Sequence, residues 1–475
     1  MYDVLVIGGG VIGGSILREL TKYQLKVCLL EKENDVSMGQ SKANSGIVHA
    51  GFDAVPNSLK AKFNVLGNKM MPAYAKELGV KYFNNGSIVV ANDNEEMLML
   101  KELKERGKQN GVEGLEIIDR EQLLAMEKNI SDLVVGALIA PTAGIVCPYE
   151  LTIASIGNAM DNGATLKTNF NVVKVTKDEH FTLYSENGDS VSAKIVINCA
   201  GLNSGKISAI CGDDSFTVNA RKGEYILLDR ESGDFVSHTL FRTPGKGGKG
   251  ILLSNTVDGN ILIGPTAEEI DGNSTDTTLK GLEKIKEKAL ETVKNIPHYN
   301  TITSFTGVRA YSNRHDFIIE ESKAVKNLIN VAGIESPGLT SAPAIAKYVV
   351  EELVSKNIEL KENKNFNGTR KPDYFFKNLS AQEKNQIIKE NPAYGKIVCR
   401  CEQITEGEII RAIRENPKAT DVDAVKRRTR AGMGRCQGGF CQIRVAELIA
   451  SELQIPFEQV TKKGNKSFLT VGKTK

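Results

Sequence analysis

Residues 3–15 read Asp-Val-Leu-Val-Ile-Gly-Gly-Gly-Val-Ile-Gly-Gly-Ser, and this stretch decides the fold. Its first five residues predict a buried parallel strand, and a helical pattern follows the glycines. A second apolar strand, residues 25–30, ends at Glu31. A strand, a glycine-rich turn, a helix, a second strand and an acid in this order are typical of the start of a dinucleotide-binding sheet.

The glycines of this turn have distinct predicted roles. Gly8 permits the tight turn, Gly10 lets the backbone approach a pyrophosphate, and Gly13 allows close packing of helix on sheet. The helix N-terminus then offers N–H donors and partial positive charge to the phosphates. Glu31, 23 residues after Gly8, can accept hydrogen bonds from a ribose. These residues alone are compatible with NAD as well as FAD.

Composition and charge restrict the classes of protein to which the chain can belong. Of its 475 residues 41% are hydrophobic and 25% are charged, and the net charge is +3. This balance argues against nucleic acid as a partner. No apolar run approaches the roughly 18–20 residues that cross a bilayer, and the N-terminus carries no leader pattern. We therefore expect a cytoplasmic protein without a membrane span, at most peripheral to the inner face of the membrane through a partner.

The eight cysteines fall into two groups. Four are scattered through apolar or loop segments and are predicted to be buried free thiols: Cys28, Cys147, Cys199 and Cys211. The other four lie within 43 residues and suit a [2Fe–2S] cluster or zinc: Cys399, Cys401, Cys436 and Cys441. Their Cys-x-Cys spacing departs from the knuckles of zinc ribbons. The basic run 426–435 would offset the negative charge of a cluster, or would form a solvated helix face.

Residues 41–53 and 57–64 resemble the flavin-contacting segment of the D-amino-acid-oxidase-like superfamily. They are most similar to bacterial glycerol-3-phosphate oxidases of the short type and to L-2-hydroxyglutarate dehydrogenases. Four later segments resemble the glycerol-3-phosphate enzymes in particular: 221–225, 248–267, 304–309 and 335–343. The resemblance covers roughly residues 1–355 and implies FAD as the cofactor and a small phosphorylated polyol as the substrate.

The resemblance also implies site residues. His49 would be catalytic, and an imidazole suits the removal of a hydroxyl proton near neutral pH, although it could instead only pack against the flavin. Arg309 and Lys249 would bind the substrate phosphate, unless they are surface cations. Ser45 and Ser336 would also contact the substrate. The expected FAD-binding residues are Gly8, Gly10, Gly13, Glu31, Ser41, Ser45, Gly201, Gly333, Gly338, Leu339 and Thr340.

The C-terminal cysteines lie in a second region of resemblance. Residues 398–402 and 426–441 resemble the bacterioferritin-associated-ferredoxin-like [2Fe–2S] domain, above all the one that ends the large subunit of anaerobic glycerol-3-phosphate dehydrogenase. The resemblance implies that the four cysteines bind a [2Fe–2S] cluster. Because such a cluster passes single electrons, it favours an electron-accepting partner subunit or quinone over oxygen as the acceptor.

The predicted fold class is α/β: a Rossmann-like FAD-binding domain with an antiparallel-sheet substrate domain, plus a small C-terminal helical cluster-binding domain. The FAD-dependent unit would span 1–360, with FAD-binding parts at about 1–80, 150–215 and 325–360 and substrate-domain parts at about 80–150 and 215–325. A linker and short helix (361–395), a cluster-binding domain (396–452) and a solvated tail (453–475) would follow.

The predicted function is the oxidation of sn-glycerol 3-phosphate to dihydroxyacetone phosphate, with hydride transfer to FAD and electron export through the cluster. Two alternatives remain open. One is an L-2-hydroxyglutarate dehydrogenase, or a dehydrogenase of another α-hydroxy or amino acid, on the same fold. The other is an electron-transfer subunit without a substrate of its own, which would not need a base such as His49.

Overall fold

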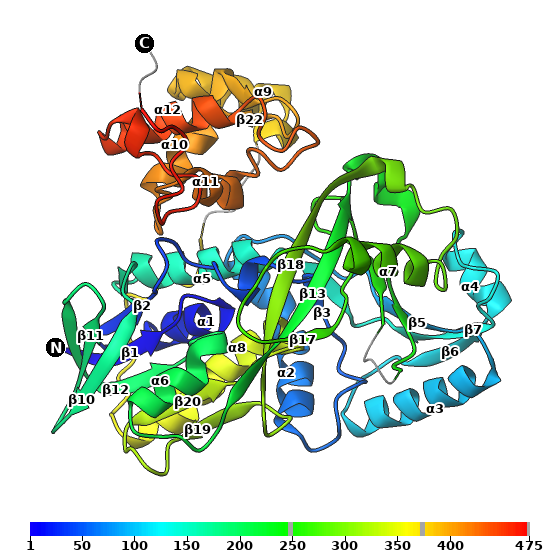
Figure 1. Ribbon diagram of the computed structural model, residues 1–475, viewed down its shortest axis with the longest axis horizontal. Coiled ribbons are helices and arrows are strands. Elements are labelled where there is room, and N and C mark those ends of the chain that lie inside the picture. Colours follow the sequence, from blue (N-terminus) through cyan, green and yellow to red (C-terminus); the bar gives the residue numbers. More distant parts are fainter. Residues whose placement is uncertain (246–249, 371–375, 473–475) are drawn as a thin grey trace.

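The computed structural model describes residues 1–245, 250–370 and 376–472. Its first sheet has eight strands within the described residues, in the order β10-β11-β12-β1-β2-β9, with β20 beside β12 and β19 beside β20 (Figure 1). β1 (Tyr2–Ile7) lies between β2 (Val27–Leu30) and β12 (Ser190–Asn198), parallel to both. β20 (Leu328–Ala332) continues the parallel part. β12 and β20, each followed within three residues by a glycine (Gly201 and Gly333), therefore both join this sheet.

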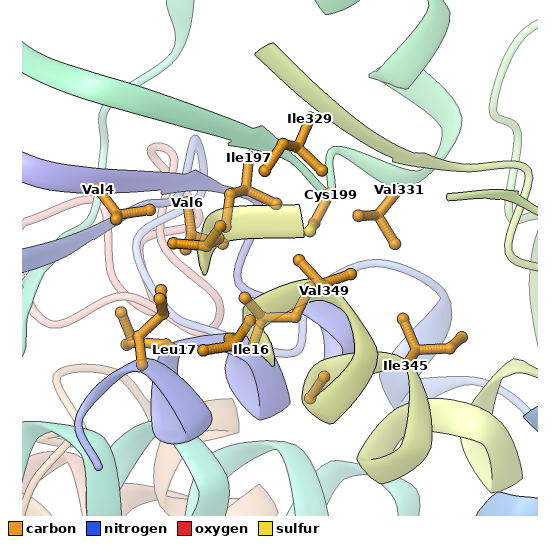
Figure 2. Packing of buried hydrophobic residues seen from close by; sticks show 14 of the residues in the cluster. Val4, Val6, Ile16, Leu17, Ile197, Cys199, Ile329, Val331, Ile345 and Val349 are labelled. Atoms are coloured by element: carbon orange, nitrogen blue, oxygen red, sulfur yellow. The ribbon is translucent and has the colours of Figure 1, made fainter. Parts of the chain in front are cut away.

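Helices from three parts of the chain cover this sheet. α1 (Val11–Leu20) lies against α5 (Pro148–Asp161) and α8 (Gly338–Tyr348), and α8 lies against α2 (Leu59–Glu77). Figure 2 shows the core between the strands and two of these helices. Its labelled apolar residues are Val4, Val6, Ile16, Leu17, Ile197, Cys199, Ile329, Val331, Ile345 and Val349. The strands are apolar throughout because a parallel sheet is buried on both faces.

A second sheet is built from the segments between these strands. Its order is β17-β13-β16-β15-β14-β5-β7-β6, with β18 beside β13. The pairs are antiparallel, as predicted, except that β14 runs parallel to β5. The bounds of its strands are β5 (Ser87–Ala91), β6 (Glu116–Asp119), β7 (Gly136–Ala140), β13 (Val218–Leu228), β14 (Thr239–Arg242), β15 (Leu252–Asn255), β16 (Ile261–Gly264), β17 (Glu268–Ile270) and β18 (Thr301–Ser312).

Smaller elements complete this part of the chain. The short strands β3 (Ile47–Val48), β4 (Tyr82–Phe83) and β8 (Gly144–Val146) form a sheet of their own beside the second sheet. The remaining elements are β9 (Thr165–Lys167), β10 (Val172–Lys177), β11 (Phe181–Ser185), β19 (Ile318–Glu321), α3 (Asn94–Gln109), α4 (Arg120–Met126), α6 (Ser204–Ile210) and α7 (Leu279–Ala289). Nowhere in the described ranges is a helix both long and apolar enough to cross a membrane.

The C-terminal unit is helical and has its own apolar core. It consists of α9 (Ala381–Glu390), β21 (Ile397–Cys399), β22 (Ile404–Thr405), α10 (Glu406–Arg414), α11 (Val422–Thr429) and α12 (Gln442–Leu453). Two of these helices begin with a capping box: Ser380 with Glu383 begins α9, and Thr405 with Glu408 begins α10. Figure 1 shows this unit above the first sheet, with α11 facing α5.

The basic run of α11 forms most of the contact between the two units. Arg427 and Arg428 are buried and bind Asp35 at 2.6 and 2.8 Å. Arg430 binds Asp258 at 2.7 Å and Glu402 at 3.0 Å. These cations are therefore neither a solvated helix face nor available to offset a cluster, because carboxylates already neutralise them.

The end of the chain also differs from the expected solvated tail. Residues 461–469 fold back, with an antiparallel bridge between Thr461 and Phe468. Gly464 lies against the side chain of Asn34, and Asn465 donates a hydrogen bond to Glu33. Lys463 and Lys466 of this turn are exposed, while Gly464 is buried against Asn34.

Candidate active site

A cleft of about 1820 Å³ runs along the carboxyl ends of the parallel strands. Its wall is formed by the glycine turn and by residues that follow β2, β12 and β20, together with the inner face of the second sheet. Ligands of open α/β sheets bind at this edge, because the loops there face a common crevice. We therefore expect the predicted FAD-binding and substrate-binding residues to line this cleft.

The glycine turn has the geometry that a dinucleotide requires. Gly8 has a φ of +112°, and a Cβ there would lie 2.4 Å from the carbonyl oxygen of Cys199. A Cβ on Gly13 would lie 2.0 Å from the Gly8 carbonyl oxygen, so Gly13 allows the close approach of α1 without lining the cleft. At Gly10 the nearest neighbour of such an atom is Ser41 Oγ at 3.2 Å, and Gly10 lines the cleft. A phosphate can therefore approach its backbone.

Glu31 and Ser41 hold this turn. The Glu31 carboxylate accepts hydrogen bonds from the N–H groups of Gly9 at 2.7 Å and Glu33 at 2.9 Å. Its pKa is raised by burial, although these hydrogen bonds oppose the shift. Ser41 Oγ accepts a hydrogen bond from the Val11 N–H at 2.8 Å. Both side chains line the cleft beside Gly10, where the ribose and diphosphate of FAD would lie.

His49 follows β3 and is held through its backbone. Its N–H donates to Thr340 Oγ1 at 2.9 Å, and its carbonyl oxygen accepts from the amides of Asn64 at 2.7 Å and Asn68 at 3.1 Å. Asn64 and Asn68 are buried on α2, and Thr340 is buried on α8. Two helices thus hold the backbone of His49, one at its N–H and the other at its carbonyl oxygen.

Ser336 and Phe241 lie beside the His49 ring. Ser336 Oγ lies 3.3 Å from Nε2, and the ring of Phe241 lies 5.8 Å away between centroids. Thr340, predicted to bind FAD, does not line the cleft. Its side chain is buried beneath His49, where its hydroxyl accepts a hydrogen bond from the His49 N–H.

Arg309 lies on β18 directly opposite Arg221 on β13. It donates to the carbonyl oxygen of Thr266 at 3.0 Å. The neighbouring Tyr225 is buried and hydrogen-bonds to Ser45, and burial raises the pKa of its hydroxyl. Since Ser45 lies four residues before His49, this bond connects the Arg309 strand pair to the histidine segment.

The structure brings most of the predicted residues to one cleft. Those that line it are Gly8, Gly10, Glu31, Ser41, Ser45, His49, Gly201, Arg309, Gly333, Ser336, Gly338 and Leu339. Lys249 lies outside the described residues. Sequence reasoning missed Tyr225, Arg221 and Phe241, which also line the cleft. Tyr225 and Arg221 stood in a segment already singled out for its family resemblance, whereas Phe241 had no signal.

The four clustered cysteines lie together as two pairs in the C-terminal unit. Cys401 Sγ is 3.5 Å from Cys436 Sγ, and a hydrogen bond joins the thiols of Cys399 and Cys441. Among the described residues no group of three or more His, Cys, Asp or Glu is arranged around one metal ion. Two thiol pairs fit the two irons of a [2Fe–2S] cluster, each of which takes two protein ligands.

Comparison with known proteins agrees with the dinucleotide-binding geometry of the cleft and with the four clustered cysteines of the C-terminal unit. Residues 3–352 match the family of FAD dependent oxidoreductases, and residues 397–451 match the BFD-like [2Fe-2S] binding domain. The chain is 49% identical to a glycerol 3-phosphate dehydrogenase of Caloramator mitchellensis, over 100% of this chain and 99% of that one. It is 36% identical to a glycerol 3-phosphate oxidase of Mycoplasma genitalium, over 77% of this chain and 97% of that one.

A solved structure gives the same result for the fold. The FAD-bound L-alpha-glycerophosphate oxidase of Mycoplasma pneumoniae superposes with a TM-score of 0.74 at 30% identity, and the match covers 78% of this chain and 98% of that one. This chain belongs to the family of FAD-dependent oxidoreductases and carries a BFD-like [2Fe–2S] binding domain.

Proposed function

We propose that this enzyme oxidises sn-glycerol 3-phosphate to dihydroxyacetone phosphate and exports the electrons through its [2Fe–2S] domain. FAD, held by the Gly10 turn, Glu31 and Ser41, supplies the hydride acceptor. The observation that carries the proposal is that a positioned imidazole, His49, and a guanidinium, Arg309, line the same cleft. Oxidation of a phosphorylated alcohol needs a base for the hydroxyl proton and a cation for the phosphate.

His49 acts as the base. Oxidation of a C–OH carbon requires removal of the hydroxyl proton as hydride leaves the carbon. Nε2 of His49 already has the Ser336 hydroxyl at 3.3 Å, so a hydroxyl can lie within reach of this nitrogen. Because Thr340, Asn64 and Asn68 fix the backbone, the ring keeps its place while the proton moves.

Arg309 binds the substrate phosphate. A guanidinium offers several N–H donors in one plane, which matches phosphate oxygens. One of these donors is held by Thr266, which orients the group. Tyr225, stacked on Phe305 with ring centroids 4.9 Å apart, keeps Ser45 beside this pair of strands. Lys249 is assigned to the phosphate together with Arg309, and Ser45 and Ser336 are assigned to the remainder of the substrate.

The relatives support phosphate over dicarboxylate recognition. Proteins named for glycerol 3-phosphate match 77% or more of this chain at 31 to 49% identity. Proteins named for L-2-hydroxyglutarate match 56 to 75% of it at 27 to 32% identity, so they are the second candidate class.

A connected path between the flavin segment and the cysteine loop supports electron export. The Val146 N–H donates to the Gly46 carbonyl oxygen at 2.8 Å. Three residues later, the Tyr149 hydroxyl contacts Met433 Sδ at 3.5 Å, and Met433 lies three residues before Cys436. The ion pairs of Arg427 and Arg428 on α11 with Asp35 hold the two units together along this path. The final acceptor would be a protein partner or quinone.

The test is anaerobic mixing of the enzyme with candidate substrates while the flavin absorbance is followed. Glycerol 3-phosphate should bleach the flavin faster than glycerol, L-2-hydroxyglutarate or proline. Equal rates with phosphorylated and unphosphorylated glycerol would contradict the phosphate assignment. Faster bleaching by L-2-hydroxyglutarate would instead identify the second candidate class.

A further inference from the structure

The C-terminal segment, residues 461–469, is held by the helix that docks the cluster domain. The N–H groups of Val422 and Asp423 donate to the carbonyl oxygens of Thr461 and Lys462, at 3.2 and 2.9 Å. The side chain of Lys462 binds Asp423 at 2.7 Å. The segment therefore takes its position from α11 and moves only if α11 moves.

The other side of this segment lies on the chain that follows β2. Gly464 has a φ of +72°, and its backbone lies so close to Asn34 that a Cβ would overlap that side chain. Asn465 Nδ2 donates to Glu33 Oε2 at 3.2 Å, and the Asn34 amide binds Asp421. These contacts are two and three residues beyond Glu31, the ribose-binding acid of the turn.

This position brings residues of the cluster domain into the wall of the FAD cleft. Lys463 and Asp423 line it together with Lys32, Glu33 and Lys42. The flavin unit contributes residues 170–172 to the same end of the cleft, where the Phe170 N–H donates to the Glu31 carbonyl oxygen at 2.8 Å. The adenosine half of the cleft is thus enclosed jointly by the two units.

The charges around Lys42 indicate which ligand chemistry this wall suits. Burial lowers the pKa of the Lys42 amine, Arg427 and Lys463 lower it further, and Asp423 and Glu33 oppose the shift. A lysine next to other cations is stabilised by an anion. Lys463 is exposed to the cleft, and the dinucleotide carries a diphosphate that must lie near Gly10 and Ser41.

We propose that residues 461–469 are part of the FAD-binding site: they close the adenosine–diphosphate end of the cleft, and Lys463 pairs with the diphosphate beside Lys42. The cluster domain then does more than carry electrons, because it also retains the flavin. Docking of the domain and binding of FAD become linked equilibria, each of which strengthens the other. FAD leaves only after this segment has moved aside.

The test measures FAD release, which needs no substrate and so does not depend on the proposed activity. The holoenzyme is diluted into buffer, and the dissociation rate is followed by the fluorescence of free FAD. Lys463→Glu should release FAD about 10- to 100-fold faster, the loss expected for one charge-assisted hydrogen bond turned into repulsion. Lys463→Arg should stay within about 2-fold of the native rate, since it keeps the cation.

Lys466→Glu is the matched control. Lys466 is an exposed lysine of the same turn that does not line the cleft, so its reversal should leave FAD release within about 2-fold of native. The iron content of each variant shows whether the cluster domain has remained folded. A native release rate in Lys463→Glu would overturn the proposal. Equal acceleration by Lys463→Glu and Lys466→Glu would also overturn it, because a general effect of charge would then explain both.

Discussion

The hydroxyl of Ser336 lies 3.3 Å from Nε2 of His49, although 287 positions separate the two residues in the chain. Ser336 follows β20 and stands directly before α8, whose Thr340 also binds the backbone of His49. The N-terminal end of α8 therefore contacts His49 through Thr340 in its first turn and through Ser336 two residues before the helix. Gly338 and Leu339 line the cleft, so the same helix end connects His49 to the wall of the cleft.

His49→Asn should keep FAD but lose flavin reduction by about 100- to 10,000-fold, the usual contribution of a positioned general base. Asparagine keeps the backbone contacts to Thr340, Asn64 and Asn68 and removes only the basic nitrogen. The measurement is the anaerobic rate of flavin bleaching at saturating substrate. An unchanged rate would mean that His49 only packs against the flavin.

Arg309→Ala should weaken the interaction with glycerol 3-phosphate by roughly 2–5 kcal/mol, because the phosphate would lose a half-buried cationic partner. The dependence of the bleaching rate on substrate concentration gives this value. Glycerol, which lacks the phosphate, serves as the control substrate. If the variant still preferred glycerol 3-phosphate over glycerol by the native ratio, Arg309 would have no part in phosphate recognition.

Gly10→Val should abolish FAD retention, since its side chain would occupy the space that the diphosphate needs. Gly10→Ala is the graded comparison. Its Cβ would lie 3.2 Å from Ser41 Oγ, a tight contact that a small shift of the serine relieves, so FAD should be weakened but retained. The ratio of flavin to protein after gel filtration measures both. A full complement of FAD in Gly10→Val would place the diphosphate elsewhere.

Cys399→Ser combined with Cys401→Ser should remove the iron and its visible absorbance while substrate still reduces the flavin. One serine replaces a ligand in each thiol pair, so both irons lose a thiolate. Turnover with dyes that take electrons from FAD should persist, whereas turnover with a protein partner should collapse. Cys211→Ser, outside the C-terminal unit, is the control. Stoichiometric zinc without iron in the native protein, purified without air, would falsify the relay.

Asp35→Asn should destabilise the docked cluster domain by about 3–5 kcal/mol at neutral pH, because Arg427 and Arg428 would stay buried without their counter-ion. Burial would raise the pKa of the Asp35 carboxyl, but Arg428 and Arg427 hold it below the ordinary value of 3.8. Its contribution is therefore fully present above that value and disappears as the pH falls through the lowered pKa.

The unfolding midpoints of the native protein and Asp35→Asn should accordingly differ by a constant amount from pH 8 to about pH 5 and converge below about pH 4. Asp214→Asn, on an exposed residue, is the control and should match the native protein throughout. A gap between native and Asp35→Asn that widened on acidification would show that the carboxyl is not held ionised by the two arginines.

Local sequence patterns predicted the dinucleotide-binding part of the site, because one continuous segment, residues 3–31, forms it. The roles of Gly8, Gly10 and Glu31 follow from spacing within a single strand–turn–helix unit. Arg427 and Arg428 could not be assigned in this way, because a basic stretch has the same sequence whether it faces water or a buried Asp35. Phe241 was missed because its place beside His49 depends on the parallel pairing of β14 with β5, which no local pattern encodes.

The position of β1 at the middle of the parallel sheet has a consequence for the biogenesis of the enzyme. β1 leaves the ribosome first, but its neighbour β12 ends at residue 198 and the next strand, β20, ends at residue 332. Domains emerge and fold in the order of synthesis. The glycine turn is therefore made long before β12 and β20, whose following residues form the opposite wall of the cleft. FAD should thus bind only late in synthesis. Chains truncated before β20 should be colourless because they lack bound flavin.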